Sequence, residues 1–325
     1  MPDAIMNPFR SPDHPVFSVV VPAFNEAACL ARFHARLTAT MDTLGTWEVL
    51  YIDDGSTDAT RAVIQTLRAA SSHVGLIALS RNFGKEIATT AGLDHARGAA
   101  VIVIDADLQD PPETIAALAA AWRNGFDMVT ARRRHRDGES WAKRATARAF
   151  YRLMRHAGRV RLPENTGDFR LMSRRVVDAL RQLREQHRFM KGLFAWVGFP
   201  TTTVEYDRAP RASGISKWGW WSLWNLALEG ITSFTTMPLK IATYLGLFVA
   251  LLSVVFGVQV IVKTLIFGNS VAGYPSLMTV ILFLGGVQLV TLGVIGEYLG
   301  RVFNETKQRP LYLVEQYEPS RERVE

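Results

Sequence analysis

Two long apolar runs near the C-terminus constrain this chain more than any other feature. Ile241–Val262 contains no charged residue, and Leu277–Gly296 is equally free of charge. At about 1.5 Å per helical residue, each run reaches roughly 30 Å, the thickness of the hydrocarbon core of a bilayer. Runs this long and this close together rarely occur in soluble domains, so a membrane hairpin is favoured over two buried core helices. We expect transmembrane helices at about 240–265 and 276–299.

The basic residues around these runs predict the orientation of the hairpin. The link Lys263–Ser276 contains one basic residue. The outer flanks contain more, namely Arg208, Arg211, Lys217, Lys240, Arg301, Lys307 and Arg309. Because basic residues stay on the cytoplasmic side, we expect both termini in the cytoplasm and a multi-pass protein of the inner (cytoplasmic) membrane.

Composition agrees with that location. The single cysteine, Cys29, excludes an internal disulfide and suits a reducing compartment. The first ten residues contain no apolar signal core, so we expect the N-terminal part to stay on the cytoplasmic side. The formal net charge of +7 suits either nucleic acid or an anionic membrane surface. With two spans present, we expect membrane lipids, and no nucleic acid, as partners.

Upstream of the apolar runs, short β-rich segments alternate with helical stretches such as Glu26–Leu44 and Thr57–Ala70. The expected strands are Phe17–Val21, Trp47–Asp53, Val74–Ser80, Ala100–Asp105 and Asp127–Ala131. This alternation predicts an α/β domain with a mostly parallel sheet flanked by helices. Ligands of such sheets bind beyond the carboxyl ends of the strands.

The chain therefore divides into five expected parts. These are a flexible N-terminus (1–16), the α/β domain (17–215), an amphipathic juxtamembrane helix (216–237), two transmembrane helices (238–300) and a cytoplasmic tail (301–325). We expect the tail to be loosely ordered after about Glu315.

Two segments are predicted to lie at the membrane surface. In 216–237, apolar side chains that include two tryptophans lie on one helical face, which suits the boundary of a bilayer. These side chains are Trp220, Leu223, Trp224, Ala227 and Ile231. In Glu139–Val160 four arginines share one face, and an ordinary surface helix remains the alternative there.

Acidic residues follow two of the expected strands at the ligand-binding edge. Asp53 and Asp54 end the second strand, and Asp105 and Asp107 end the fourth. Two carboxylate clusters at one edge repel each other unless a cation or donor groups offset their charge. An Asp-x-Asp pair offers the hard oxygen ligands that hold Mg²⁺ or Mn²⁺, which in turn binds a diphosphate. The glycine patterns of the P-loop and of dinucleotide folds are absent, so we expect a nucleotide bound through metal and carboxylates.

Seven short motifs occur in order along the chain. They are Val21-Pro22-Ala23-Phe24-Asn25-Glu26, Asp53-Asp54-Gly55-Ser56-Thr57-Asp58, Arg81-Asn82-Phe83-Gly84-Lys85-Glu86, Asp105-Ala106-Asp107-Leu108-Gln109-Asp110-Pro111-Pro112-Glu113, Asn165-Thr166-Gly167-Asp168-Phe169-Arg170-Leu171, Arg188-Phe189-Met190-Lys191-Gly192 and Gly214-Ile215-Ser216-Lys217-Trp218. The first four resemble family 2 glycosyltransferases of the GT-A fold. Together with the helix pair, the last three resemble the polyprenyl-phosphate glycosyltransferases, which include bactoprenol glucosyltransferases and dolichyl-phosphate mannose synthases. The resemblance extends from Phe17 to about Tyr312.

The resemblance implies roles for individual residues. Nucleotide-binding residues would be Pro22, Asn25, Glu26, Asp53, Lys85 and Asp105. The metal on the diphosphate would be bound by Asp107 and Gln109. Asp168 would lie near the reacting centre, Arg132 and Arg136 would hold the acceptor phosphate, and Lys217 would lie in a loop that closes over the donor.

Simpler roles compete with these. Asn25 and Ser56 would merely cap helices, Asp168 would be a structural partner of Arg170, and the arginines around Arg132 would form a solvated loop.

The resemblance also implies a reaction. It is the inverting transfer of a sugar from a nucleotide-sugar, with a UDP-sugar favoured and UDP-glucose expected, to a polyprenyl (undecaprenyl) phosphate at the cytoplasmic membrane face. A processive polysaccharide synthase is disfavoured because the chain lacks a Gln-x-x-Arg-Trp motif and has few spans. A non-catalytic scaffold that binds a nucleotide-sugar is the other alternative. Gly285, Gly286 and Gly293 allow close helix packing within the hairpin or between copies of the chain, so a homo-oligomer stays open.

Overall fold

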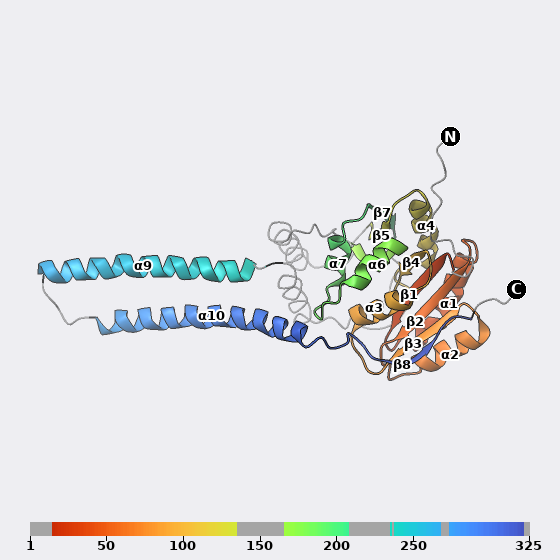
Figure 1. Cartoon of the computed structure of the whole chain (residues 1–325), viewed down its shortest axis with the longest axis horizontal. Coiled ribbons are helices and arrows are strands. Elements are labelled where there is room, and N and C mark those ends of the chain that lie inside the picture. The colour runs from red at the N-terminus through yellow and green to blue at the C-terminus, as the bar shows by residue number, and fades with distance from the viewer. Residues whose placement is uncertain (1–14, 135–165, 208–234, 236, 268–272, 322–325) are drawn as a thin grey trace.

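The computed structural model describes residues 15–134, 166–207, 235, 237–267 and 273–321. It consists of an α/β domain and a long hairpin of two helices that extends away from it (Figure 1). The sheet of the domain has eight strands in the order β7-β5-β6-β4-β1-β2-β3-β8. All strands except β6 and β8 run in the same direction. The predicted mostly parallel sheet is therefore confirmed.

The strand bounds are β1 Phe17–Ala23, β2 Trp47–Asp53, β3 Val74–Leu79, β4 Ala100–Val103, β5 Met128–Arg133, β6 Thr166–Ser173, β7 Thr201–Tyr206 and β8 Val314–Glu318. The first five coincide with the predicted segments to within a few residues. The other three were not predicted, because polar residues interrupt their sequences and two of them lie at the edges of the sheet.

The helix bounds are α1 Ala27–Met41, α2 Thr60–Ala70, α3 Lys85–His95, α4 Ile115–Arg123, α6 Arg174–Gln182 and α7 Met190–Trp196, with a 3-10 turn, η1, at Pro112–Thr114. Apolar side chains pack on both faces of the sheet. Val19 and Val21 belong to one core cluster and Val20 to the other, because successive side chains of a strand point to opposite faces. A strand covered on both sides is apolar throughout, as β1 is.

The hairpin consists of α9 Met237–Phe267 and α10 Tyr274–Thr306. The most apolar windows, Met237–Gln259 and Phe283–Thr306, have mean hydropathies of 2.3 and 1.3, and almost all of their described side chains lie outside the protein core. Both helices are thus long and apolar enough to cross a membrane, as predicted. Most of the expected juxtamembrane helix 216–237, and the arginine-lined segment 139–160, lie outside the described residues.

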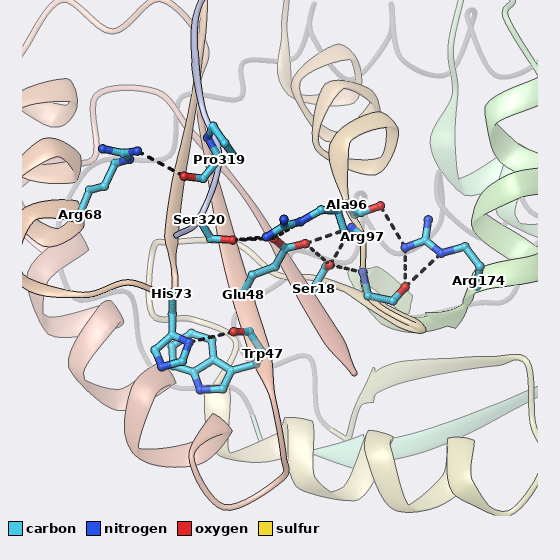
Figure 2. A network of polar contacts seen from close by, with 11 residues as sticks. Ser18, Trp47, Glu48, Arg68, His73, Ala96, Arg97, Arg174, Pro319 and Ser320 are labelled. Atoms are coloured by element: carbon cyan, nitrogen blue, oxygen red, sulfur yellow. Dashed lines mark hydrogen bonds and ion pairs between the residues drawn. The ribbon is translucent and has the colours of Figure 1, made fainter. Parts of the chain in front are cut away.

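The expectation of a loosely ordered tail after about Glu315 is wrong. Strand β8 pairs antiparallel with β3, with Tyr317 opposite Ile77. The tail is held further on by Ser320, whose hydroxyl donates to buried Glu48 (2.8 Å) and accepts from Arg97 (2.5 Å), as Figure 2 shows. Without the tail, β3 would present unpaired backbone groups at the edge of the sheet.

Candidate active site

The turn after β2 organises the carboxyl edge of the sheet. The side chain of Asp54 accepts hydrogen bonds from the backbone nitrogens of Phe83 (2.7 Å) and Gly84 (2.9 Å). Burial raises the pKa of Asp54, and these two donors partly offset that rise. Gly55 has a φ of +66°, and a Cβ there would lie 2.5 Å from the backbone carbon of Arg81. A residue with a side chain would therefore force this turn and the loop before α3 apart.

Asp53 lies deeper in the same turn. Its side chain is fully buried, and its two oxygens accept hydrogen bonds from the backbone nitrogen of Ser56 (3.0 Å) and from Arg61 Nε (2.9 Å). Each carboxylate oxygen has two lone pairs, so Asp53 can accept further hydrogen bonds besides these two. The structure thus places Asp53 at the predicted nucleotide edge, where it holds the turn.

The segment after β1 is bound to this turn. Asn25 has a φ of +57°, and its Oδ1 accepts a hydrogen bond from the backbone nitrogen of Thr57 (2.9 Å). The backbone nitrogen of Asn25 donates to Ser56 Oγ (3.1 Å). Helices α1 and α2 have Glu26 and Ala59 at their N-cap positions, without side-chain capping bonds. The alternative that Asn25 and Ser56 are helix caps is therefore wrong.

The other two predicted residues of this segment are Glu26 and Pro22. The backbone nitrogen of Glu26 donates to Thr60 Oγ1 (2.8 Å), which joins the start of α1 to the start of α2. Pro22 is a buried residue of β1, opposite Ile52. The predicted nucleotide-binding residues of this segment and of the turn after β2 are thus brought together.

Lys85, at the start of α3, joins two carboxylates. Its Nζ lies 2.7 Å from Asp105 Oδ2 and 2.7 Å from Asp168 Oδ2. Strand β6 runs antiparallel to β4, with Arg170 opposite Val103. This pairing brings Asp168, near the start of β6, to the edge where β4 ends and Asp105 follows.

Burial and ion pairing act in opposite directions in this cluster. Burial alone would raise the pKa of Asp168, but attraction to Lys85 and Lys191 holds it below its usual range. Burial raises the pKa of Asp105 despite the neighbouring Lys85. The two carboxylates in turn keep Lys85 protonated. Its side chain as a whole is still 43% exposed.

Asp168 has one free carboxylate oxygen. Within the described residues, Oδ1 is buried and has no hydrogen-bond partner. Arg170 donates to the main-chain oxygens of Gly167 (2.8 Å) and Asp168 (3.2 Å) and lies 3.6 Å from the ring centre of Phe194. Arg170 therefore shapes the backbone here, while the Asp168 carboxylate is paired with Lys85 and offers Oδ1 to a ligand.

The predicted metal ligands lie on the loop after β4. Asp107 Oδ1 accepts a hydrogen bond from the backbone nitrogen of Gln109 (3.0 Å), and the Gln109 side chain is buried. In the described part of the chain, no three His, Cys, Asp or Glu side chains form a metal site by themselves. Mg²⁺ usually binds one or two carboxylates together with substrate phosphates. The oxygen donors of Asp107 and Gln109 on one loop suit a divalent cation whose remaining ligands come from a diphosphate.

The arginines at the end of β5 point to opposite faces. Arg132 pairs with Glu205 of β7, and Arg134 lies 3.7 Å from the same carboxylate. Arg133 points the other way, donates to Tyr206 Oη (3.1 Å) and lies 3.6 Å from buried Asp110. Arg132, one of the two residues predicted to bind the acceptor phosphate, thus lies on the same face of the sheet as Glu205. Arg136 and Lys217 lie outside the described residues.

Two residues at the site were not predicted. Glu86 Oε2 accepts a hydrogen bond from the backbone nitrogen of Met190 (3.2 Å), which joins α3 to α7. Burial, together with repulsion from Asp168, raises the pKa of Glu86 to about 7. Lys191 contributes positive charge to both Glu86 and Asp168. Both residues lie in motifs quoted above, but neither spacing nor composition indicates which motif side chains face the site.

Two family models match parts of the chain. Residues 18–181 match the model of glycosyl transferase family 2, and residues 237–302 match that of the GtrB C-terminal hairpin. Residues 303–325 lie outside both ranges.

Two curated relatives match most of the chain. The chain is 51% identical over 299 residues to the bactoprenol glucosyl transferase of Shigella phage SfV, which covers 91% of this chain and 97% of that one. It is 49% identical, with the same coverage, to a prophage bactoprenol glucosyl transferase homolog of Escherichia coli strain K12. A solved structure of glucosyl-3-phosphoglycerate synthase from Mycobacterium tuberculosis aligns with a TM-score of 0.44 at 19% identity, over 67% of this chain and 77% of that one.

Proposed function

The chain belongs to glycosyl transferase family 2, and we propose that it transfers a glucosyl group from UDP-glucose to a polyprenyl phosphate. The family and the enzyme class are established by the matches over most of the chain. The acceptor and the sugar are proposed from the names of relatives that are about half identical in sequence.

The donor would bind at the carboxyl edge of the sheet. The base and ribose would lie against the segment around Asn25 and the turn around Asp53, which are bound to each other. Lys85 and Asp105 lie further along the edge, where the diphosphate would follow. The cationic Lys85 offsets part of the charge of the two carboxylates, so a diphosphate can approach them.

A divalent cation, Mg²⁺ or Mn²⁺, would neutralise charge on the departing nucleoside diphosphate. Asp107 and Gln109 would hold it, and within the described residues Asp168 Oδ1 has no hydrogen-bond partner. The role of this chain's residues is to present these oxygens at fixed positions. Asp168 is fixed by Lys85, and Asp107 by the backbone nitrogen of Gln109.

The acceptor needs little activation. The second pKa of a phosphate monoester is about 6, so most of the acceptor is dianionic near neutral pH. We therefore assign Asp168 to positioning rather than to proton abstraction. An acceptor oxygen would attack the anomeric carbon as the bond to the nucleoside diphosphate breaks, and this in-line displacement inverts the configuration there. Arg132 and Arg136 would bind the acceptor phosphate, and the loop that contains Lys217 would close over the donor.

The hairpin would place this site at the lipid surface. A polyprenyl phosphate lies in the bilayer with its headgroup at the interface, so the enzyme must be held there. Basic residues follow α10, among them Lys307 and Arg309, which supports a cytoplasmic position for the α/β domain and both termini.

The observation that carries this proposal is the bridge from Lys85 to Asp105 and Asp168 in a chain that also has the apolar helix pair. The test uses full-length protein in detergent with Mg²⁺ or Mn²⁺, undecaprenyl phosphate and labelled UDP-glucose, UDP-N-acetylglucosamine or GDP-mannose. Metal-dependent label in the lipid extract from UDP-glucose alone is the expected result. Label from another donor would correct the sugar, and nucleotide binding without label from any donor would favour the scaffold.

A further inference from the structure

Arg61 connects the turn after β2 to the C-terminal strand. It lies in the first turn of α2, and its Nε is 2.9 Å from Asp53 Oδ2. Its Nη2 is 2.8 Å from Glu315 Oε2, on β8. Asp53 is fully buried and Glu315 is largely exposed. The Arg61 guanidinium group thus joins buried Asp53, at the carboxyl edge of the sheet, to Glu315, which follows α10 in the chain.

Strand β8 is held at both ends. Its antiparallel pairing with β3 sets Val314 opposite Leu79, at the edge where the donor would bind. Just beyond, the backbone nitrogen of Ser80 donates to the oxygen of Leu313 (3.0 Å). Beyond the other end of β8, the Ser320 hydroxyl is hydrogen-bonded to Glu48 and Arg97 (Figure 2). Glu315 is therefore presented to Arg61 by an anchored strand rather than by a loose tail.

We propose that Arg61 is a positioning residue of the donor site and that Glu315 of β8 promotes nucleotide binding through Arg61. The inference rests on the proposed function, since it takes the turn after β2 as the place of the nucleotide. The C-terminal strand, which lies outside the residues matched by either family model, becomes part of the donor site.

The physical reason lies in the geometry of the guanidinium group. Arginine donates through a planar fork, so a partner on one arm fixes the direction of the other. Glu315 occupies Nη2 and thereby aims Nε at Asp53. Asp53 in turn holds the backbone nitrogen of Ser56, and Ser56 Oγ accepts from Asn25. Loss of the Glu315 contact would leave Arg61 free to swing toward solvent and loosen this turn.

The strand offers a matched control. Glu318 also lies on β8 and pairs with an arginine of α2, Arg68, at 2.6 Å, but this pair does not reach Asp53. We would compare Glu315→Ala with Glu318→Ala in the full-length protein in detergent. The readouts are the dissociation constant for UDP, KM for donor and acceptor, kcat and thermal stability.

Glu315→Ala should raise the UDP dissociation constant and the donor KM about threefold to fivefold, as expected for one partly exposed ion pair. The acceptor KM and kcat should stay within about twofold. Glu318→Ala should change the donor constants by less than about 1.5-fold. Equal effects of the two substitutions on UDP binding, or no effect of Glu315→Ala, would overturn the proposal.

A double-mutant cycle separates positioning from general support of the fold. If Glu315 acts through Arg61, then Glu315→Ala should have no further effect on UDP binding in an Arg61→Ala background. Additive effects would show that Glu315 acts by another route. Arg61→Lys keeps the charge but cannot serve both carboxylates in the same geometry, so it should resemble Glu315→Ala. If Arg61→Ala does not fold, the cycle is measured with Arg61→Gln, which removes the charge that Glu315 pairs with.

The UDP measurement also keeps the two proposals apart. If wild-type protein binds UDP but transfers no sugar, the proposed reaction fails, and the comparison of Glu315→Ala with Glu318→Ala still decides the role of Glu315. If sugar is transferred and the two variants behave alike, only the role of Glu315 fails.

Discussion

Lys85 Nζ lies 2.7 Å from Asp168 Oδ2, although the two residues belong to α3 and to β6. This ion pair joins a residue that the resemblance assigns to the nucleotide with one that it assigns to the reacting centre. The two roles thus depend on each other. A change at Lys85 alters the charge and position of Asp168, and a change at Asp168 releases Lys85.

Replacing Lys85 by methionine should reduce transfer at least about 100-fold. Two carboxylates would then face each other without a counter-charge, and their pKa values would rise. Because Lys85 is partly exposed, we expect the free energy of unfolding to fall by only about 1 to 2 kcal/mol, less than for a fully buried pair. Activity and denaturant unfolding are measured on the same sample. Lys85→Arg should recover part of the activity, and equal activities of Lys85→Met and wild type would contradict the pairing.

Removal of the metal should abolish transfer, and Asp107→Asn should reduce it about 100-fold or more. Membrane association should be unchanged, because the hairpin is not involved. Glu113→Gln is the matched control, since Glu113 lies nearby in sequence but is exposed and paired with Arg36. It should keep transfer within about twofold of wild type. Normal turnover by Asp107→Asn, or activity in excess chelator, would refute the metal assignment.

Replacing Arg132 and Arg136 by glutamine should raise the KM of polyprenyl phosphate about tenfold and the donor KM by less than about twofold. The reason is that each bond from an arginine to a phosphate is charge-assisted. Arg134→Gln is the control, because Arg134 shares the Glu205 carboxylate with Arg132. Equal changes in both KM values would place these arginines outside the acceptor site.

The stability of the protein should depend on pH through Glu86. Burial raises the pKa of Glu86 from 4.5 to about 7 in the folded protein. Between these values the folded state binds more protons than the unfolded state, so the free energy of unfolding falls as the pH rises. Well above pH 7 the penalty for the charged carboxylate is complete, and it amounts to roughly 3 kcal/mol.

Glu86→Gln should therefore be more stable than wild type above about pH 7, and the difference should vanish toward pH 4.5. Thermal unfolding between about pH 4.5 and 8 measures this difference. Both proteins keep Lys85, Lys191 and Asp168. The contribution of these groups to the pH dependence therefore cancels to first order in the difference. Parallel pH profiles of the two proteins would show that Glu86 is charged in the folded state across this range.

Local patterns in the sequence were sufficient to predict the core strands and the hairpin. Strands β1 to β5 are short apolar segments bounded by polar turns, and the two helices α9 and α10 are long runs without charge at their centres. These properties belong to single segments, so no knowledge of distant contacts is needed to recognise them. The same holds for the acidic residues after β2 and β4, because parallel strands place their carboxyl ends at one edge.

Only the tertiary structure decided which side chains meet at that edge. Strands β6 and β8 contain polar residues among the apolar ones and run against the others. Their pairing depends on neighbours far away in the chain. The pairing of β6 brings Asp168 to Lys85, and the pairing of β8 brings Glu315 to Arg61. A sequence pattern records which residues alternate or repeat within a segment, whereas these contacts depend on the register between segments, which is set by packing across the whole sheet.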